Sequence, residues 1–313
     1  MKSSLNYLIP MSEPHDCRTD SVRNGSFKRG YDGKRVQRFL CKICKSSFSE
    51  STFKETCWQK KPFINATVFH LLCGGFSQRR AAFVLGVDRK TIVRKFILLG
   101  KKAEKLIPIL NRAFLKVENF EFDDLETFEH TKCKPISVTM AVESKTRWVI
   151  GSRVSSMNAK GKLSKLALKK YGKRKDTRKK ARQSLFNEIK EFIEPDAHIQ
   201  SDMNPHYMAD VKEHFPNAKY QTHRSRRACV VGQGELKRGG FDPLFTLNHT
   251  FAMFRANMNR LFRRTWCTTK KPERLGYHIA LYTLYHNLFL INLGKKQGHA
   301  SFLTPELLSG NII

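Results

Sequence analysis

The spacing of apolar residues changes along this chain, and that change limits the folds the sequence can adopt. In 61–111 apolar residues recur every three or four positions, as in amphipathic helices. From Phe114 onward they alternate with polar residues, as in Ile136–Val142 and Arg147–Val154, which is typical of strands. Helical spacing returns at Arg178–Ile193. The sequence therefore predicts a helical module followed by an α/β domain.

The chain carries a large excess of positive charge. Lysine and arginine number 58 against 27 acidic residues, for a formal charge of +31. Such an excess indicates a polyanionic partner, because basic side chains release counterions from phosphate backbones. Ribosomal and membrane-surface proteins share this property. One very basic stretch, 160–180, predicts either a segment along a phosphate backbone or a solvated run of charge.

Two apolar segments of the chain are too short or too interrupted to be a membrane span or an export signal. His278–Leu293 is interrupted by polar residues and falls short of the roughly 20 residues that a membrane span needs. The first eleven residues lack the continuous apolar core of a secretory signal. The sequence therefore predicts a cytoplasmic, nucleoid-associated protein with no membrane partner.

A pair of cysteines suggests a metal site near the amino terminus. Cys41 and Cys44 have the C-x2-C spacing that can hold one side of a tetrahedral zinc ion. The upstream half is incomplete, since only Cys17 is present, with His15 two residues before it. We expect zinc bound by these four residues, against the alternative of a metal-free remnant. Asn24-Gly25 and Asp32-Gly33 are hairpin-turn signals between the two halves.

The next segment is predicted to form two helices joined by a tight turn. Ser77 is a good N-cap for a helix over 78–84, and Asp88 caps a second helix that runs toward Leu99. The expected shared core is Ala81, Val84, Val87, Ile92 and Val93. The residues expected on the outer, DNA-facing side are Arg89, Lys90, Thr91, Arg94 and Lys95. An ordinary helical hairpin is the alternative.

Isolated acidic residues stand out in so basic a chain. Asp123 and Asp124 follow the apolar strand 120–122, and Asp202 follows the extended segment 198–201. Phosphoryl transfer by two divalent metals needs carboxylates that converge from separate elements, because the metals clamp the attacking and leaving oxygens. Ordinary acids at strand ends or turns are the alternative.

The order of these features resembles a known family. A cysteine pair, two capped helices, Phe-Asp-Asp-Leu-Glu-Thr-Phe, Ser-Asp-Met-Asn-Pro-His-Tyr and a late arginine-rich helix follow one another. This order resembles the DDE-type transposases of short bacterial insertion sequences over nearly the whole chain. The resemblance implies that Asp123 is the first catalytic aspartate, with Asp124 next to it, and that Asp202 is the second.

The third catalytic position departs from the common pattern. The resemblance maps it to Asn248, with Arg255 seven residues on, where the family often has glutamate followed by lysine or arginine. An asparagine carbonyl can ligate magnesium but adds no charge, so Glu235 or Asp242 remain alternatives for the third ligand. Arg255 could equally contact phosphate. The helix is expected to bury a stripe formed by Leu247, Phe251, Phe254, Met258 and Leu261.

The resemblance implies a specific organisation and activity. It implies a zinc-ribbon-like module at 1–55, a helix-turn-helix module at 56–112, and a ribonuclease H-like catalytic domain at 113–313 with a basic insertion near 160–182. The implied fold of the catalytic domain is α/β, with a mixed sheet and flanking helices. The implied activity is cleavage and strand transfer of double-stranded DNA with Mg²⁺ or Mn²⁺, in a homo-oligomer on DNA. Zn²⁺ would occupy the amino-terminal module. A non-enzymatic or inactivated transposase-derived DNA-binding protein is the alternative.

Overall fold

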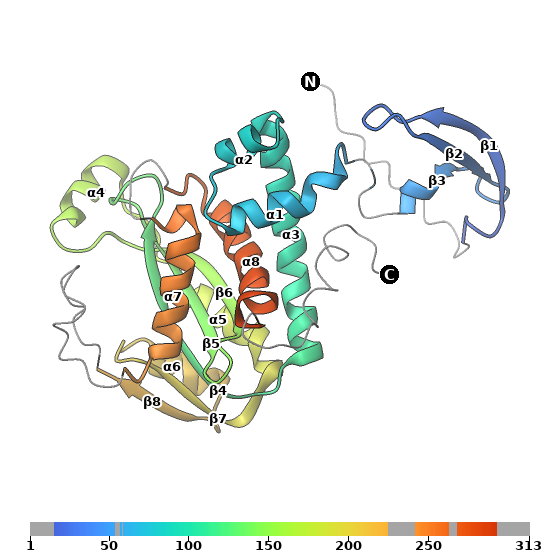
Figure 1. Ribbon diagram of the computed structural model, residues 1–313. Helices are drawn as coiled ribbons and strands as arrows, with labels where there is room; N and C mark the ends of the chain where they lie inside the picture. Colours follow the sequence, from blue (N-terminus) through green and yellow to red (C-terminus); the bar gives the residue numbers. More distant parts are fainter. Residues whose placement is uncertain (1–15, 54–56, 58, 225–241, 263–267, 293–313) are drawn as a thin grey trace. The chain divides into compact units, whose positions relative to one another are not determined.

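The computed structural model describes residues 16–53, 57, 59–224, 242–262 and 268–292 (Figure 1). The chain forms two compact units, the first ending at Phe63 and the second beginning at Ile64. The helical module and the larger sheet both belong to the second unit. The proposed module boundaries at residues 55 and 112 stay predictions. No described helix is long and apolar enough to cross a membrane.

The first unit contains a small antiparallel sheet of order β1-β2-β3. Its strands are β1 (Ser21–Lys28), β2 (Arg35–Cys41) and β3 (Ser47–Ser49), followed by the 3-10 turn η1 (Glu50–Phe53). The ring of Phe48 lies 5.6 Å from that of Phe39 and 5.1 Å from that of Phe53, between centroids. These rings form the unit's small apolar core.

The two predicted hairpin turns have different outcomes. Asp32-Gly33 lies between β1 and β2, and Gly33 has a φ of 69°, so this turn is confirmed. Asn24-Gly25 is not a turn. Gly25, with a φ of 68°, lies inside β1, where the register with β2 shifts between Arg23 and Ser26. Glycine at positive φ serves a bulge as readily as a turn, so the dipeptide alone does not distinguish them.

Three helices open the second unit. They are α1 (Asn65–Cys73), preceded by the 3-10 turn η2 (Pro62–Ile64), α2 (Gln78–Val84) and α3 (Arg89–Phe114). Both predicted caps are confirmed, because Ser77 Oγ accepts from the amide of Arg80 at 3.2 Å and Asp88 Oδ1 from that of Lys90 at 2.7 Å. The second helix continues beyond Leu99 to Phe114, in agreement with the helical spacing predicted over 61–111.

The shared core of α2 and α3 differs in part from the prediction. Ala81 and Ile92 are fully buried, as expected. Val84 is 58% exposed, and Ala82 is buried in its place. Val84 is the last residue of a two-turn helix, where burial depends on how the following turn leaves the helix rather than on the helical period alone.

A mixed five-stranded sheet forms the centre of the second unit, with the order β6-β5-β4-β7-β8. β5 is antiparallel to both β4 and β6, whereas β7 and β8 run parallel to β4. The predicted α/β class with a mixed sheet is therefore confirmed. The strands are β4 (Val117–Phe128), β5 (Pro135–Glu143), β6 (Val149–Ser156), β7 (Ile193–Asp202) and β8 (Lys219–His223).

Helices flank this sheet (Figure 1). Phe120, Phe122 and Ile199 pack with Phe186 of α5 and Tyr207 of α6 in one buried cluster. Helix α7 contacts β4 and β5, and α8 contacts β6 and the long helix α3. The remaining elements are α4 (Leu163–Tyr171), α5 (Arg178–Ile189), η3 (Lys190–Phe192), α6 (Tyr207–His214), α7 (Phe245–Asn257), η5 (Asn259–Leu261), α8 (Pro272–Leu288) and η7 (Leu290–Asn292).

The basic stretch near 160–182 contains a helix. Helix α4 covers Leu163–Tyr171 and carries Lys169 and Lys170 in its last turn. Leu168 and Tyr171 on the same helix are 60% and 45% exposed. The stretch is thus a basic, largely solvent-facing helix between β6 and α5.

Candidate functional site

Two of the predicted catalytic aspartates lie side by side on neighbouring parallel strands. In the β4–β7 pairing Glu121 is opposite Gln200, and continuing this register by two residues puts Asp123 opposite Asp202. Asp202 ends β7, as expected. Asp123 does not end its strand, because β4 continues to Phe128. The strand continues beyond the aspartates, because both aspartates and the residues after them pair with β5 without interruption.

The carboxylate of Asp123 is held by two donors. Tyr207 Oη donates to Asp123 Oδ1 at 3.0 Å, and the amide of Asp124 donates to the same oxygen at 2.6 Å. Burial, and then the charge of Asp202, raises the pKa of Asp123 to about 7. Burial and the neighbouring carboxylates also raise the pKa of Tyr207, so its hydroxyl remains a donor.

Asp124 and Asp202 are the acidic neighbours of Asp123, but the three carboxylates do not form one compact group of ligands: among the described residues, only the three cysteines bring three ligand atoms within 4.8 Å of one another. Thr139 donates to Asp124 Oδ1, while Asp124 Oδ2 is buried with no hydrogen-bond partner among the described residues. Asp202 Oδ1 accepts from the amide of Asn204 at 3.0 Å. Burial, and to a lesser extent the charge of Asp124, raises the pKa of Asp202. A cation bound between Asp123 and Asp202 would relieve the repulsion between their carboxylates.

The raised pKa of Asp123 predicts a pH dependence of stability in metal-free protein. The folded state prefers the neutral carboxyl, because the pKa rises from an ordinary value near 4 to about 7. This group's contribution to the unfolding free energy is therefore greatest at low pH and is lost as the pH rises through 7. Lowering the pH from about 8 to about 6 should add about 1 kcal/mol through this residue alone.

Urea unfolding in the presence of a chelator measures this effect. Asp123→Asn should remove that part of the pH dependence. It should leave the part due to Glu121, whose pKa burial also raises to about 7. Identical pH profiles for wild type and Asp123→Asn would show that Asp123 ionises as an ordinary exposed acid.

Glu121 ties α7 to the sheet. This residue is only 3% exposed, and its Oε2 accepts from the amide of Leu247 at 2.9 Å. No side chain of α7 itself caps this end of the helix, where the N-cap position is Leu244. The buried carboxylate therefore satisfies an amide of the first turn and holds this end of α7 against β4.

Asn248 follows Leu247 on an exposed position of α7. Its Nδ2 donates to Asp242 Oδ2 at 2.9 Å. Within the described residues no hydrogen bond joins Asn248 to Asp123 or Asp202. The structure thus pairs Asn248 with one of the alternative third ligands, Asp242, while the other, Glu235, lies outside the described residues.

Arg255 lies two turns further along the same helix, half-buried. All five residues of the predicted stripe are at most 4% exposed, as expected, but α7 ends at Asn257, so the last two lie beyond the helix. The five residues are Leu247, Phe251, Phe254, Met258 and Leu261.

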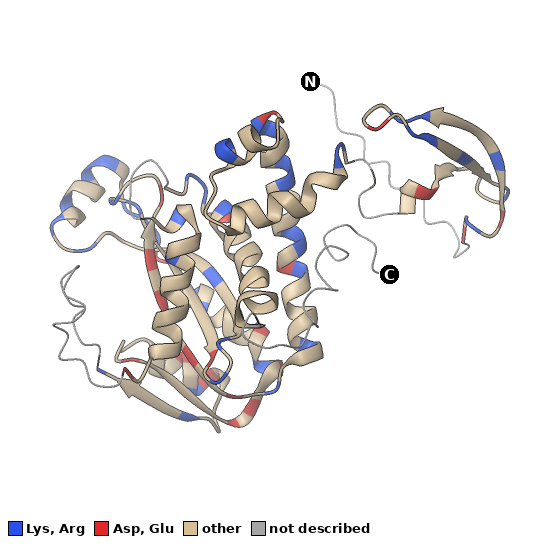
Figure 2. Ribbon diagram, in the orientation of Figure 1, with Lys and Arg blue, Asp and Glu red and all other residues tan. Residues whose placement is uncertain are grey.

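The predicted DNA-facing residues of α3 do not all face solvent. Arg89, Lys90 and Arg94 are exposed, and Thr91 is half-buried. Lys95 is 5% exposed, contrary to its expected outer position, and burial lowers its pKa to about 8. Lys95 is placed on the buried side because α3 packs against neighbouring helices around this turn. The exposed cations near the start of α3 are visible in Figure 2.

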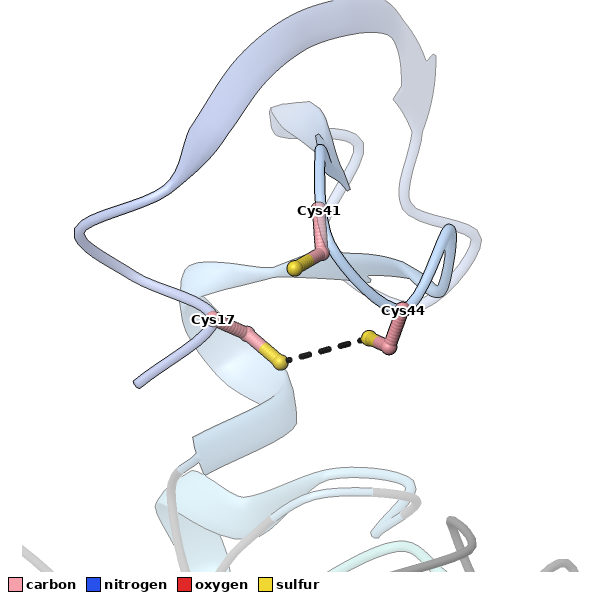
Figure 3. A group of neighbouring side chains, drawn as sticks. All are labelled: Cys17, Cys41 and Cys44. Atoms are coloured by element: carbon pink, nitrogen blue, oxygen red, sulfur yellow. Dashed lines mark hydrogen bonds between the residues drawn. The ribbon is translucent and has the colours of Figure 1, made fainter. Parts of the chain in front are cut away.

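The three predicted cysteine ligands lie together (Figure 3). Cys17 Sγ lies 3.6 Å from Cys44 Sγ, and the three sulfurs, with that of Cys41, are all within 4.8 Å of one another. Tetrahedral zinc with bonds of 2.3 Å separates its sulfurs by roughly 3.8 Å, so the cluster fits one ion. Burial, then the neighbouring thiols, raises the pKa of Cys17 to about 11 without a metal. His15 lies outside the described residues.

Several residues of these sites were not assigned a role from sequence. Tyr207 stands within the segment Ser-Asp-Met-Asn-Pro-His-Tyr, but only the strand pairing brings it to Asp123. Glu121 is the polar residue between Phe120 and Phe122 in the alternating pattern of a strand. That pattern does not indicate its hydrogen bond with the amide of Leu247, which lies 126 residues later in the chain.

Comparison with known proteins finds only distant structural likenesses. No family model matches the chain, and no curated protein matches it. A chain of the cryo-electron microscopy structure of the simian T-cell lymphotropic virus intasome in complex with PP2A regulatory subunit B56 gamma is similar at 14% identity and a TM-score of 0.29. The match covers 71% of this chain and 66%, just under two thirds, of that chain. No activity follows from so low a TM-score.

Proposed function

We propose that this protein is a DDE-type transposase that binds the ends of an insertion sequence, cleaves DNA and transfers the cut strand to a target. The observation that carries the proposal is the adjacency of Asp123 and Asp202 on parallel strands, with Asp124 beside them. Phosphoryl transfer is the chemistry that such a group of hard, charged oxygen ligands suits best.

The sheet topology supports a ribonuclease H-like domain. β5 and β6 lie on one side of β4, whereas β7 and β8 lie on the other. The chain therefore reverses its strand order between β4 and β7, and open α/β sheets bind their ligands at such switch points. Asp202 lies at the carboxyl end of β7, next to this point.

The aspartate carboxylates are the ligands that Mg²⁺ or Mn²⁺ prefers. Asp123 and Asp202 would hold the metal, and Asn248 is proposed as the third ligand, with Asp242 beside it. When bound, the metal would neutralise charge on the attacking and leaving oxygens of a phosphodiester. Tyr207 and the amide of Asp124 fix one oxygen of Asp123 and so orient its carboxylate.

The remaining parts supply DNA binding. Arg89, Lys90 and Arg94 are exposed near the start of α3, where a recognition helix contacts bases and phosphates. The basic helix α4 would hold the phosphate backbone without reading sequence. Cys17, Cys41 and Cys44 would hold Zn²⁺ in a module that contacts double-stranded DNA. A homo-oligomer would join two element ends.

A DNA-binding protein that has lost catalysis is the second candidate. One observation favours it: Asn248 adds no charge to the site, and its amide is engaged with Asp242. A chain with only two catalytic carboxylates would bind metal more weakly than one with three.

Alanine at Asp123 and at Asp124, made separately, tests the proposal. Cleavage and strand transfer would be measured on DNA that carries the element's ends, with Mg²⁺ and with Mn²⁺. Asp123→Ala is expected to abolish both reactions, because it removes the carboxylate opposite Asp202. Asp124→Ala should lower them about 10-fold to 100-fold, the usual range for a residue that supports a metal ligand.

Wild type should react only with a divalent metal present. DNA binding by all three proteins, with no reaction by wild type under either metal, would favour the second candidate. If Asp124→Ala abolished both reactions and Asp123→Ala only lowered them, Asp124 would be the metal ligand in place of Asp123.

A further inference from the structure

A cleft of about 940 Å³ lies in the second unit, away from the three aspartates. The elements around it are α2, the start of α3, η5 and α8. Its lining includes Leu72 and Phe96 from the helical module and Asn259, Phe262 and His278 from the carboxyl-terminal part. The cleft therefore joins two segments that are distant in sequence.

The charged residues of this cleft all carry the same sign. They are Arg79, Arg80, Arg89, Arg260 and Lys270, and none of the described lining residues is acidic. Arg79, Arg80 and Arg89 are exposed. These three form a cationic rim contributed by α2 and α3.

Arg260 is the interior cation of the cleft. Its guanidinium lies 5.3 Å from the centre of the Phe96 ring. Burial, then the charge of Arg274, lowers the pKa of Arg260 to about 10. No described carboxylate forms an ion pair with it. Arg260 is half-buried, and a partly desolvated guanidinium that no described carboxylate neutralises would be stabilised by a bound anion.

His278 is a second polar group at the same place without a complete set of partners. It is 2% exposed and lines the cleft. Its Nε2 donates to the carbonyl of Leu72 at 3.0 Å, while Nδ1 is buried with no partner in the described structure. Burial, then the charge of Arg260, lowers the pKa of His278 to about 3, so the ring is neutral. Nδ1 is an acceptor and does not bind a phosphate oxygen, so Arg260, with which no described carboxylate pairs, is the interior group of the cleft that would contact an anion.

We propose that this cleft binds the phosphodiester backbone of a nucleic-acid strand, with Arg260 as the interior phosphate ligand and Arg79, Arg80 and Arg89 as contacts along the rim. The cleft is far larger than one phosphate requires, and its cations come from separate elements, which suits an extended polyanion. This inference rests on the proposed function, because both require that the protein binds DNA. It concerns DNA binding alone, and the cleft does not include the catalytic carboxylates.

Binding of the full chain to a fluorescent duplex and to a single-stranded oligonucleotide tests this site. Both titrations are made without added Mg²⁺ or Mn²⁺, so that no cleavage contributes and the zinc of the first unit is kept. Arg260→Gln should weaken binding of at least one of these DNAs about 10-fold and lower the salt slope by about one ion. Arg79→Gln should lower the same slope. Lys212→Gln, on the exposed side of α6, removes one charge elsewhere and should leave affinity within about twofold.

Thermal unfolding separates binding from a purely structural role. Without DNA, Arg260→Gln should melt no lower than wild type, because it removes a half-buried charge that no described carboxylate neutralises. A lower melting temperature with unchanged DNA affinity would overturn the proposal and make Arg260 structural. Thermal unfolding with pyrophosphate tests for a site that binds free phosphate instead of DNA. If pyrophosphate stabilises wild type but not Arg260→Gln, and the variant binds DNA as tightly as wild type, the proposal is also overturned. A wild type that binds DNA through this cleft but never cleaves would leave the site standing and contradict only the proposed function.

Discussion

Replacing Asp202 with asparagine is expected to lower metal-dependent DNA cleavage by more than about 100-fold, beyond the usual effect of changing a residue that only supports a metal ligand. Asparagine keeps the size of the side chain and an oxygen, but it removes the negative charge. The remaining pair, Asp123 and Asp124, would then face the metal from β4 alone. Strand transfer should fall in parallel, because both reactions use the same carboxylates in our proposal.

DNA binding should survive this substitution. Asp202 is half-buried, and its Oδ1 accepts only the amide of Asn204 among the contacts described. Asparagine can retain that contact through its carbonyl oxygen. Removing one of these mutually repelling acids should also leave the metal-free protein at least as stable as wild type, because burial and a neighbouring charge both raise the pKa of Asp202.

Asp196→Asn provides a matched control. Asp196 is an exposed residue of the same strand, β7, and the substitution changes charge in the same way. Its cleavage rate should stay within about twofold of wild type, since exposed surface changes seldom have larger effects. Equal activity of wild type and Asp202→Asn would remove this residue from the reaction and, with it, the observation on which the function rests.

Local chemistry explains most of what could be predicted from sequence. The caps at Ser77 and Asp88 were predictable because a short polar side chain before a helical period satisfies free amides. The stripe on α7 followed from period alone. Asp123 and Asp202 were identified because isolated acidic residues stand out in so basic a chain and because the family resemblance maps both to catalytic positions. Strand pairing then places them on neighbouring strands.

Long-range packing explains what could not be predicted. Lys95 is buried because α3 is covered around this turn, and a single helix's spacing cannot show how many neighbours will cover it. Val84 is exposed for the opposite reason. The contacts of Glu121 with α7 and of Tyr207 with Asp123 join residues 126 and 84 positions apart, so no local pattern reports them.

The first unit should lose its fold when its metal is removed. Of the described residues up to Phe63, only Cys41 and Phe48 are buried apolar side chains, which is too small a core to stabilise a domain of this size. Structural zinc contributes about 10–16 kcal/mol in comparable small modules. Purified protein should therefore contain about one zinc ion per chain, and a strong chelator should unfold the first unit while the second unit keeps its cooperative transition.

The double variant Cys41→Ser, Cys44→Ser should contain no zinc and should show the same loss without chelator. Cys57→Ser is the matched control, because Cys57 is a half-buried cysteine of the same unit that does not belong to the three-sulfur cluster. It should keep the zinc and the fold. Metal analysis and amide hydrogen exchange of residues 16–53 measure both outcomes. A wild type that is free of metal and still protects the amides of β1 and β2 would show that the three thiols are a remnant, held together by the hairpin and the Phe39–Phe48–Phe53 rings rather than by an ion.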